Sequence, residues 1–159
     1  MATLDNKIKA IALHTEIPWY DEEDKLTIRP DITILDPSCM SIKKQTSLYI
    51  RNGKIYYEKV PKVPSKGFSF SGKAIAVEIK FIRTRGGITE SQISKFEADV
   101  GKLLNLIQRF NGTGNNEVFG IFVVFNKTDK GRNLFEHFKG NYVNNQNLEI
   151  IYGSGKLEI

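Results

Sequence analysis

Three consecutive segments in the second half of the chain constrain its fold most. Residues 73–81, KAIAVEIKF, alternate between an apolar face and a second face, as a strand does. Residues 89–112 carry apolar side chains at helical spacing, and Thr89 and Gln92 form a capping box at their start. Residues 118–125, VFGIFVVF, are the continuous apolar run expected of a strand covered on both faces. A strand, a helix and a strand in this order predict a βαβ crossover with two parallel strands.

Shorter elements are expected around this unit. Residues 26–35, LTIRPDITIL, predict a strand that begins at Pro30 or is unpaired there, because proline donates no ladder hydrogen bond. Asn52-Gly53 between β-rich flanks predicts a hairpin over residues 47–58. Further elements are expected at 4–14 (a short helix or an edge strand), 131–140 (a short helix), 147–153 and 155–159 (closing strands).

Length and composition indicate one globular domain. A chain of 159 residues fits a single domain spanning residues 1–159, with enough apolar sequence for a core. Cys39 is the one cysteine, so no internal disulfide forms and a reducing cytosol fits. No apolar run approaches the ~18 residues of a membrane span, and the first residues lack the pattern of a secretion signal. We therefore expect no membrane association and a cytoplasmic location.

Charge is distributed unevenly along the chain, whose net charge is +5. Residues 51–73 hold six basic residues and one acid, whereas residues 15–36 hold seven acids and two basic residues. The basic segment would attract a polyanion, and the acidic segment could gather carboxylates around a cation. The alternative is that both segments are simply solvated surfaces.

Two charges interrupt the apolar strand at residues 73–81. Glu78 and Lys80 lie two residues apart, so both side chains point to the same face near the carboxyl end of the strand. A bound cation would offset the desolvation of a buried carboxylate. If the strand that holds Asp31 neighbours this one, two carboxylates converge beside one ammonium group. Hard oxygen ligands suit Mg²⁺ or Mn²⁺, and the main-chain carbonyl of Ile79 could be a third ligand.

These residues resemble a known family. RPDITI followed by VEIKF, with Pro30-Asp31 and Glu78-Ile79-Lys80, is similar to the motif of the PD-(D/E)XK nucleases, the restriction-endonuclease-like phosphodiesterases. The resemblance implies an α/β (α+β) fold with a restriction-endonuclease-like core, in which helices flank a mixed β-sheet. The implied order is a helix, three antiparallel strands, a helix and a parallel strand. A β-hairpin and a basic arm would be inserted at 43–73.

The same resemblance implies roles for individual residues. Asp31 and Glu78 would bind Mg²⁺ (or Mn²⁺), and Lys80 would be the catalytic lysine that assists attack by a metal-activated water. Family members often add an acid from the first helix and supporting residues on the helix after the motif. The positions this implies here are Glu16, Gln92 and Lys95.

The implied function is a Mg²⁺-dependent endonuclease that hydrolyses phosphodiester bonds of DNA, with RNA left open as a substrate. Lysines of the basic arm would contact backbone phosphates, namely Lys59, Lys62, Lys66 and Lys73. Aromatic side chains of the same region could stack on bases or pack within the hairpin, namely Tyr49, Tyr56, Tyr57, Phe68 and Phe70.

Two alternatives to an active nuclease stay open. One is a non-cleaving nucleic-acid-binding module, or a subunit of a larger restriction or repair assembly, that retains the nuclease fold. The other is a small α/β protein whose charges are structural, in which Glu78 and Lys80 form an ion pair at a strand end and Asp31 is a turn acid. With or without cleavage, the chain could form a homodimer or join a partner subunit.

Overall fold

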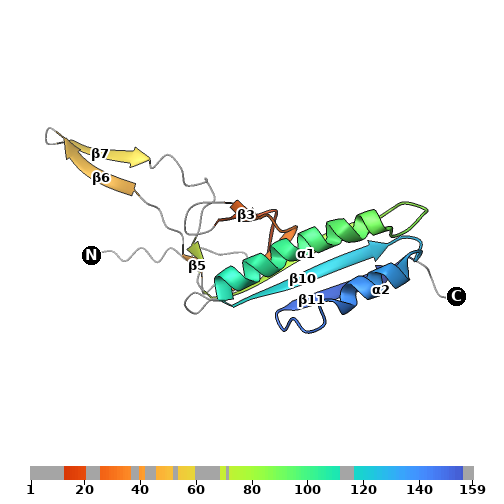
Figure 1. Cartoon of the computed structure of the whole chain (residues 1–159). Coiled ribbons are helices and arrows are strands. Elements are labelled where there is room, and N and C mark those ends of the chain that lie inside the picture. Colours follow the sequence, from red (N-terminus) through yellow and green to blue (C-terminus); the bar gives the residue numbers. More distant parts are fainter. Residues whose placement is uncertain are drawn as a thin grey trace.

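The fold is built on a five-stranded mixed sheet (Figure 1) with strand order β1-β4-β9-β10-β11. The computed structural model describes residues 13–20, 26–36, 40–41, 46–51, 54–59, 69–70, 72–111 and 117–155. The strands of the sheet are β1 (Leu13–Thr15), β4 (Ile32–Leu35), β9 (Lys73–Ile82), β10 (Glu117–Asn126) and β11 (Leu148–Ser154). β4 pairs antiparallel with β1 and β9, whereas β10 is parallel to β9 and β11. The described part of the protein is therefore α+β.

Two helices cover one face of this sheet. α1 spans Glu90–Asn111 and α2 spans Arg132–Gly140. Phe96 of α1, Phe122 of β10 and Phe138 of α2 contact one another, with ring centroids 5.6 to 6.1 Å apart. Because one β10 side chain touches both helices, both lie on the same side. The βαβ unit predicted from the sequence is confirmed as β9, α1 and β10.

Smaller strand pairs flank the sheet. β2 (Trp19–Tyr20) pairs with β3 (Leu26–Ile28), and β5 (Met40–Ser41) pairs with β8 (Ser69–Phe70). β6 (Thr46–Arg51) and β7 (Lys54–Lys59) form the antiparallel hairpin predicted from the sequence. The turn expected at Asn52-Gly53 and the elements expected at 4–12 and 156–159 lie outside the described residues. None of the described helices is long and apolar enough to cross a membrane.

Pro30 breaks the strand expected over residues 26–35 into β3 and β4. β3 ends at Ile28 and β4 begins at Ile32, so the prediction that pairing would fail near Pro30 is confirmed. Pro30 itself is buried and has no N–H to leave unsatisfied. Beyond the break, Thr33 and Leu35 are buried, while Ile32 and Ile34 are half-buried. Asp31 therefore stands in the gap, immediately before β4 starts.

The second face of the sheet is only partly covered in the described part of the chain. Along β10 the residues facing the helices are buried, but alternate residues from Phe119 to Val123 are half-buried and Phe125 is exposed. The expectation that both faces of this strand would be covered is therefore not met among the described residues. On β9 the same alternation buries Ala74 and Ala76 on the helix side.

Candidate functional site

Asp31 is joined to β9 through its carboxylate. The Ile79 main-chain N–H donates a hydrogen bond of 2.7 Å to Asp31 Oδ2. β4 and β9 pair from Ile32 opposite Val77 onward, so this side chain takes the place of the ladder partner lost before β4 begins. The Glu16 N–H donates to the Asp31 carbonyl at 3.2 Å. Asp31 is thus brought beside the Glu78–Lys80 motif from a distant part of the sequence.

Lys80 lies between two carboxylates. Its ammonium group is 2.6 Å from Glu78 Oε1 and 2.8 Å from Asp99 Oδ2, the latter on α1. The three side chains are largely covered, with relative exposures of 13% for Glu78, 27% for Lys80 and 19% for Asp99. The Glu78–Lys80 contact is also what the purely structural alternative predicts. The site therefore lies between the carboxyl half of β9 and the facing side of α1.

The carboxylates outnumber the ammonium groups here. Three carboxylates lie near two ammonium groups: Lys80 pairs with Glu78 and Asp99, Lys102 Nζ pairs with Asp99 Oδ1 at 2.8 Å, and Asp31 acts on Glu78 through its charge. Burial raises the pKa of the Glu78 carboxyl, and the charges of the two neighbouring aspartates raise it further against the opposing effect of Lys80. When all its groups are ionised, the cluster has a net charge of −1. Glu78 is the carboxylate whose ionised form is disfavoured there.

Lys80 carries its proton firmly. Burial alone would lower the pKa of its ammonium group, but the hydrogen bonds to Asp99 and Glu78 outweigh burial and raise the pKa. On Asp99, burial would raise the carboxyl pKa, yet its bonds to Lys102 and Lys80 lower it. Lys80 is therefore a hydrogen-bond donor at neutral pH and cannot accept a proton.

The donor atoms fit a divalent cation in kind. Asp31 Oδ2 and Glu78 Oε1 are engaged, but Asp31 Oδ1 and Glu78 Oε2 accept no hydrogen bond from the described residues. Within the described ranges, no cluster of three or more histidine, cysteine, aspartate or glutamate side chains is arranged to hold a metal. Mg²⁺ sites often use one or two carboxylates and complete the shell with water and substrate phosphate. Asp31 and Glu78 are two carboxylates of the kind that such a site uses.

The supporting residues expected from the sequence have other surroundings. Gln92 Oε1 accepts the Thr89 N–H at 2.8 Å, so its side chain serves the helix cap, as the capping box predicted. Lys95 is exposed, and none of its described contacts joins it to Glu78 or Lys80. Glu16 is brought next to Asp31 by its backbone, but its side chain is exposed and its φ is 50°. Neither helix residue lies in the cluster.

The residue on α1 that reaches the motif is Asp99, which sequence reasoning missed. It follows Gln92 by seven positions and Lys95 by four, so it lies on the helix face that was expected to contribute. Asp99 also borders the buried stripe, next to Val100. The one signal in the sequence was that an acid directly precedes Val100 of the apolar stripe. The axial position of the contact depends on how far the loop before α1 extends, and the sequence pattern does not determine that.

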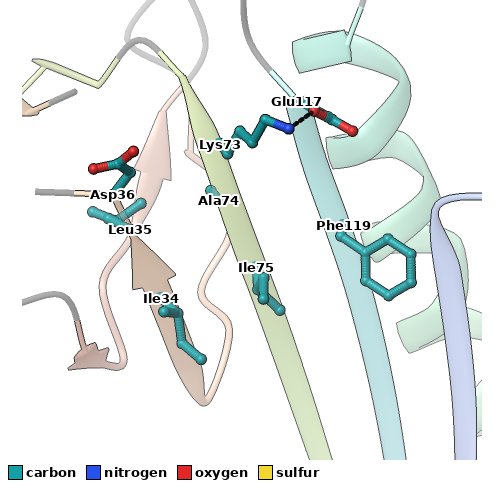
Figure 2. A pocket seen from close by; sticks show the side chains of 8 residues that line it. All are labelled: Ile34, Leu35, Asp36, Lys73, Ala74, Ile75, Glu117 and Phe119. Atoms are coloured by element: carbon teal, nitrogen blue, oxygen red, sulfur yellow. Dashed lines mark ion pairs between the residues drawn. The ribbon is translucent and has the colours of Figure 1, made fainter. Parts of the chain in front are cut away.

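Lys73, expected to contact nucleic acid, lies at the far end of β9. Its ammonium group pairs with Glu117 Oε2 at 3.0 Å across the start of β9 and β10. This pair borders a hollow of ≈ 350 Å³ (Figure 2). Its lining residues are Ile34, Leu35, Asp36, Lys73, Ala74, Ile75, Glu117 and Phe119. The hollow lies at the amino end of β9, and neither Glu78 nor Lys80 lines it.

The other arm lysines are not placed by the structure. Lys59 is the last residue of β7, and its side chain is not described. Lys62 and Lys66 lie outside the described residues.

Comparison with known proteins adds no further assignment, since no family model, curated protein or solved structure matches the chain. The function must therefore be inferred from the site itself.

Proposed function

We propose that the protein is a metal-dependent nuclease that hydrolyses phosphodiester bonds of DNA and resembles the PD-(D/E)XK enzymes. The observation that carries the proposal is the bond from the Ile79 N–H to the Asp31 carboxylate. That bond holds Asp31 against β9 next to Glu78, whose carboxylate pairs with Lys80. The order of β1, β4 and β9 as antiparallel neighbours, followed by α1 and the parallel β10, supports it.

The proposed roles follow from the chemistry of each side chain. Asp31 and Glu78 would hold Mg²⁺ or Mn²⁺ through their free oxygens, with the Ile79 carbonyl as a further donor. The ion would bind a phosphate oxygen and acidify its water. Lys80 has three N–H donors, of which the described structure uses two, so one remains for a phosphate oxygen. Asp99 positions Lys80 and keeps it protonated.

Cleavage of plasmid DNA with Mg²⁺ or Mn²⁺ tests the proposal. We expect the native protein to cut and Glu78→Gln and Asp31→Asn to be inactive, because each amide is a poor ligand for a hard cation. Lys80→Met should lower kcat ~10²–10³-fold, the usual effect of removing one donor to a developing charge. The matched control is Glu117→Gln, which neutralises an exposed glutamate in the ion pair at the opposite end of β9.

Binding of Mn²⁺, measured by calorimetry, gives a second readout. Heat of binding should be present for the native protein and for Glu117→Gln, and absent for Glu78→Gln. If Glu78→Gln cuts DNA as fast as the native protein, the assignment of Glu78 is wrong. Thermal melting of each variant separates loss of function from loss of fold.

The non-cleaving nucleic-acid-binding module is the second candidate. It is favoured by the close contacts of Lys80 with two carboxylates, which already satisfy much of its charge without a metal. This candidate predicts DNA binding that is insensitive to Mn²⁺ and to Glu78→Gln, with no cutting of any DNA form.

A further inference from the structure

Two exposed phenylalanines are stacked on the second face of the sheet, the face opposite α1 and α2, which is called the open face below. Phe81 of β9 and Phe125 of β10 are register partners, and their rings lie 5.2 Å apart with an interplanar angle of 18°. Their exposed fractions are 61% and 44%. Gly153 of β11 lies beside Phe125, and a Cβ there would come within 2.9 Å of the ring, so glycine leaves the space the ring occupies. The pair forms an exposed aromatic stack at the carboxyl end of the strands.

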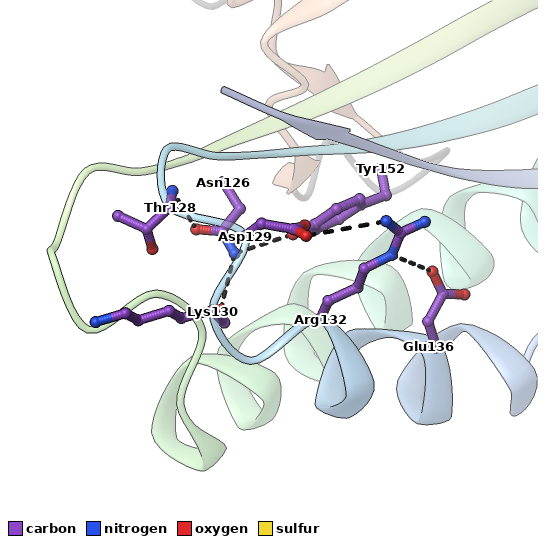
Figure 3. A network of polar contacts seen from close by, with 7 residues as sticks. All are labelled: Asn126, Thr128, Asp129, Lys130, Arg132, Glu136 and Tyr152. Atoms are coloured by element: carbon purple, nitrogen blue, oxygen red, sulfur yellow. Dashed lines mark hydrogen bonds and ion pairs between the residues drawn. The ribbon is translucent and has the colours of Figure 1, made fainter. Parts of the chain in front are cut away.

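Two loops at this end of the sheet carry strong positive charge. Residues 83–89 and 127–132 include five basic residues and one acid, a net charge of +4, against +5 for the whole chain. The loops are joined, because the Ile88 N–H donates to the Lys130 carbonyl at 2.9 Å. Figure 3 shows the second loop, where the single acid, Asp129, is held by Tyr152. The positive charge is therefore fixed next to the aromatic pair.

Most of these cations have no acidic partner. Within the part of the chain that the structure describes, Arg83, Arg85, Lys127 and Lys130 are exposed and form no ion pair with a carboxylate. Arg132 is the exception, since it pairs with Glu136. Four cations on two connected loops, with no carboxylate partner among the described residues, make a surface that attracts polyanions.

The cations and the rings belong to one surface. The Arg83 guanidinium lies 5.9 Å from the Phe81 ring centroid. The Lys127 N–H donates to the Ile82 carbonyl at 3.0 Å, which continues the parallel ladder past the end of β10. Because side chains alternate along a strand, Arg83 and Lys127 are the next residues on the side of Phe81 and Phe125. Aromatic faces flanked by cations are what unpaired nucleotides require.

We propose that this end of the open face binds an unpaired DNA strand, with bases stacked on Phe81 and Phe125 and phosphates contacting Arg83, Lys127 and the adjacent loop cations. A duplex keeps its bases stacked internally, so it cannot use the rings. A second copy of this chain docked symmetrically here would bring its own positive loops against these. The choice of DNA rests on the proposed nuclease function. The binding surface and its preference for an unpaired strand are independent of that function.

The surface lies on the opposite side of β9 from the candidate site. Phe81 follows Lys80 directly, so their side chains point to opposite faces. A strand held on Phe81 would pass around the carboxyl end of the sheet toward Glu78 and Lys80. The substrate of the proposed nuclease would therefore be DNA with an unpaired segment, such as a single strand, a flap or a branch.

Fluorescence anisotropy with the full chain tests the surface in the presence of a chelator, so that no cleavage intervenes. The probes are a labelled oligothymidine DNA strand, its DNA duplex with oligodeoxyadenosine, and the matching RNA strand, oligouridine. We expect the single DNA strand to bind tighter than the duplex. Phe81→Leu/Phe125→Leu should weaken it about tenfold or more, because stacking on an aromatic ring is lost. Phe81→Tyr/Phe125→Tyr should retain the affinity.

The leucine and tyrosine pairs separate stacking from general apolar contact, and both substitutions are at exposed positions. Val143→Ala, at an apolar residue that is 77% exposed, is the control and should bind as the native protein does. Equal binding by the leucine pair, preference for the duplex, or preference for RNA would overturn the proposal. So would a native dimer that the leucine pair converts to monomer with unchanged DNA binding. If the binding results agree with the proposal but the native protein does not cut DNA, the proposed nuclease function is wrong and the binding surface stands.

Discussion

At the scale of single residues, Tyr152 connects the loop after β10 to the sheet. Its hydroxyl donates to Asp129 Oδ1 at 2.7 Å and accepts from Asn126 Nδ2 at 3.0 Å. Asn126 is 1% exposed and also donates to the Lys130 carbonyl at 2.9 Å. The phenol thus holds the one acid among the basic loops and supports a buried amide. Burial first, and then the bond to Asp129, raise the pKa of Tyr152 to about 12.

We predict that Tyr152→Phe lowers the free energy of unfolding by about 1–2 kcal/mol at pH 8, because two hydrogen bonds are lost at one site. The sign of the pH effect follows from the raised pKa. Between pH 10 and about 12 the folded protein keeps this proton while the unfolded chain releases it, so the contribution of Tyr152 is full below pH 10 and declines above. Urea unfolding at pH 8 and at pH 11 should show a smaller difference between native and variant at the higher pH.

Tyr142→Phe is the control for this measurement at pH 8. Its hydroxyl makes no hydrogen bond among the described residues, so its removal should change stability by no more than about 0.5 kcal/mol, as at ordinary surface sites. Equal losses for the two tyrosines would show that the bonds to Asp129 and Asn126 contribute nothing.

How far the candidate site could be predicted from sequence depends on the kind of contact. Glu78 and Lys80 were expected on one face because strand alternation fixes that relation locally, and their ion pair agrees with it. Asp31 was expected only if its strand neighboured β9, and the bond to Ile79 meets that condition. Asp99 could not be found in this way, because its contact depends on how α1 is placed along β9.

At the scale of elements, the loops before α1 and α2 depend on two glycines. Gly87 has φ 71° and Gly131 has φ 75°, a region in which L-residues are strained. A Cβ at Gly131 would overlap the Ile88 carbonyl, and one at Gly87 would overlap Lys130. The long elements were predictable because their apolar periods are local, as in α1 and β10. The interlocking of these loops is a tertiary fit that the sequence pattern did not reveal.

Opposite effects are predicted for two glycine-to-alanine changes. Gly131→Ala should destabilise the fold by more than about 1–2 kcal/mol. A left-handed backbone alone costs that much for alanine, and the Ile88 backbone must also move. Gly101→Ala, in the exposed middle of α1 with no atom within 4 Å of the new Cβ, should stabilise it by about 0.5–1 kcal/mol. Thermal melting measures both. A neutral Gly131→Ala would mean that the two loops do not pack as described.

At the scale of the whole molecule, charge is separated between two surfaces of one sheet end. The helix side of β9 holds the acidic cluster of Asp31, Glu78 and Asp99, where negative charge exceeds positive. The connected loops beyond the strands hold the cations. A polyanion would therefore be attracted to the loops and repelled by the cluster unless a cation were bound there. Substrate approach and metal binding would then be coupled through the field of the protein.

The effect of this field should be visible in the salt dependence of single-strand binding. If Arg83, Arg85, Lys127 and Lys130 each contact a phosphate, log K should fall with log salt with a slope of about −3, since each contact contributes about −0.7. Arg85→Gln/Lys130→Gln should reduce the slope by about 1.4, because two counterion-releasing contacts are lost. Arg109→Gln removes one positive charge in the last turn of α1, at the other end of the helix, and should leave the slope as it is. A slope that is the same for both variants would place the phosphate contacts elsewhere on the chain.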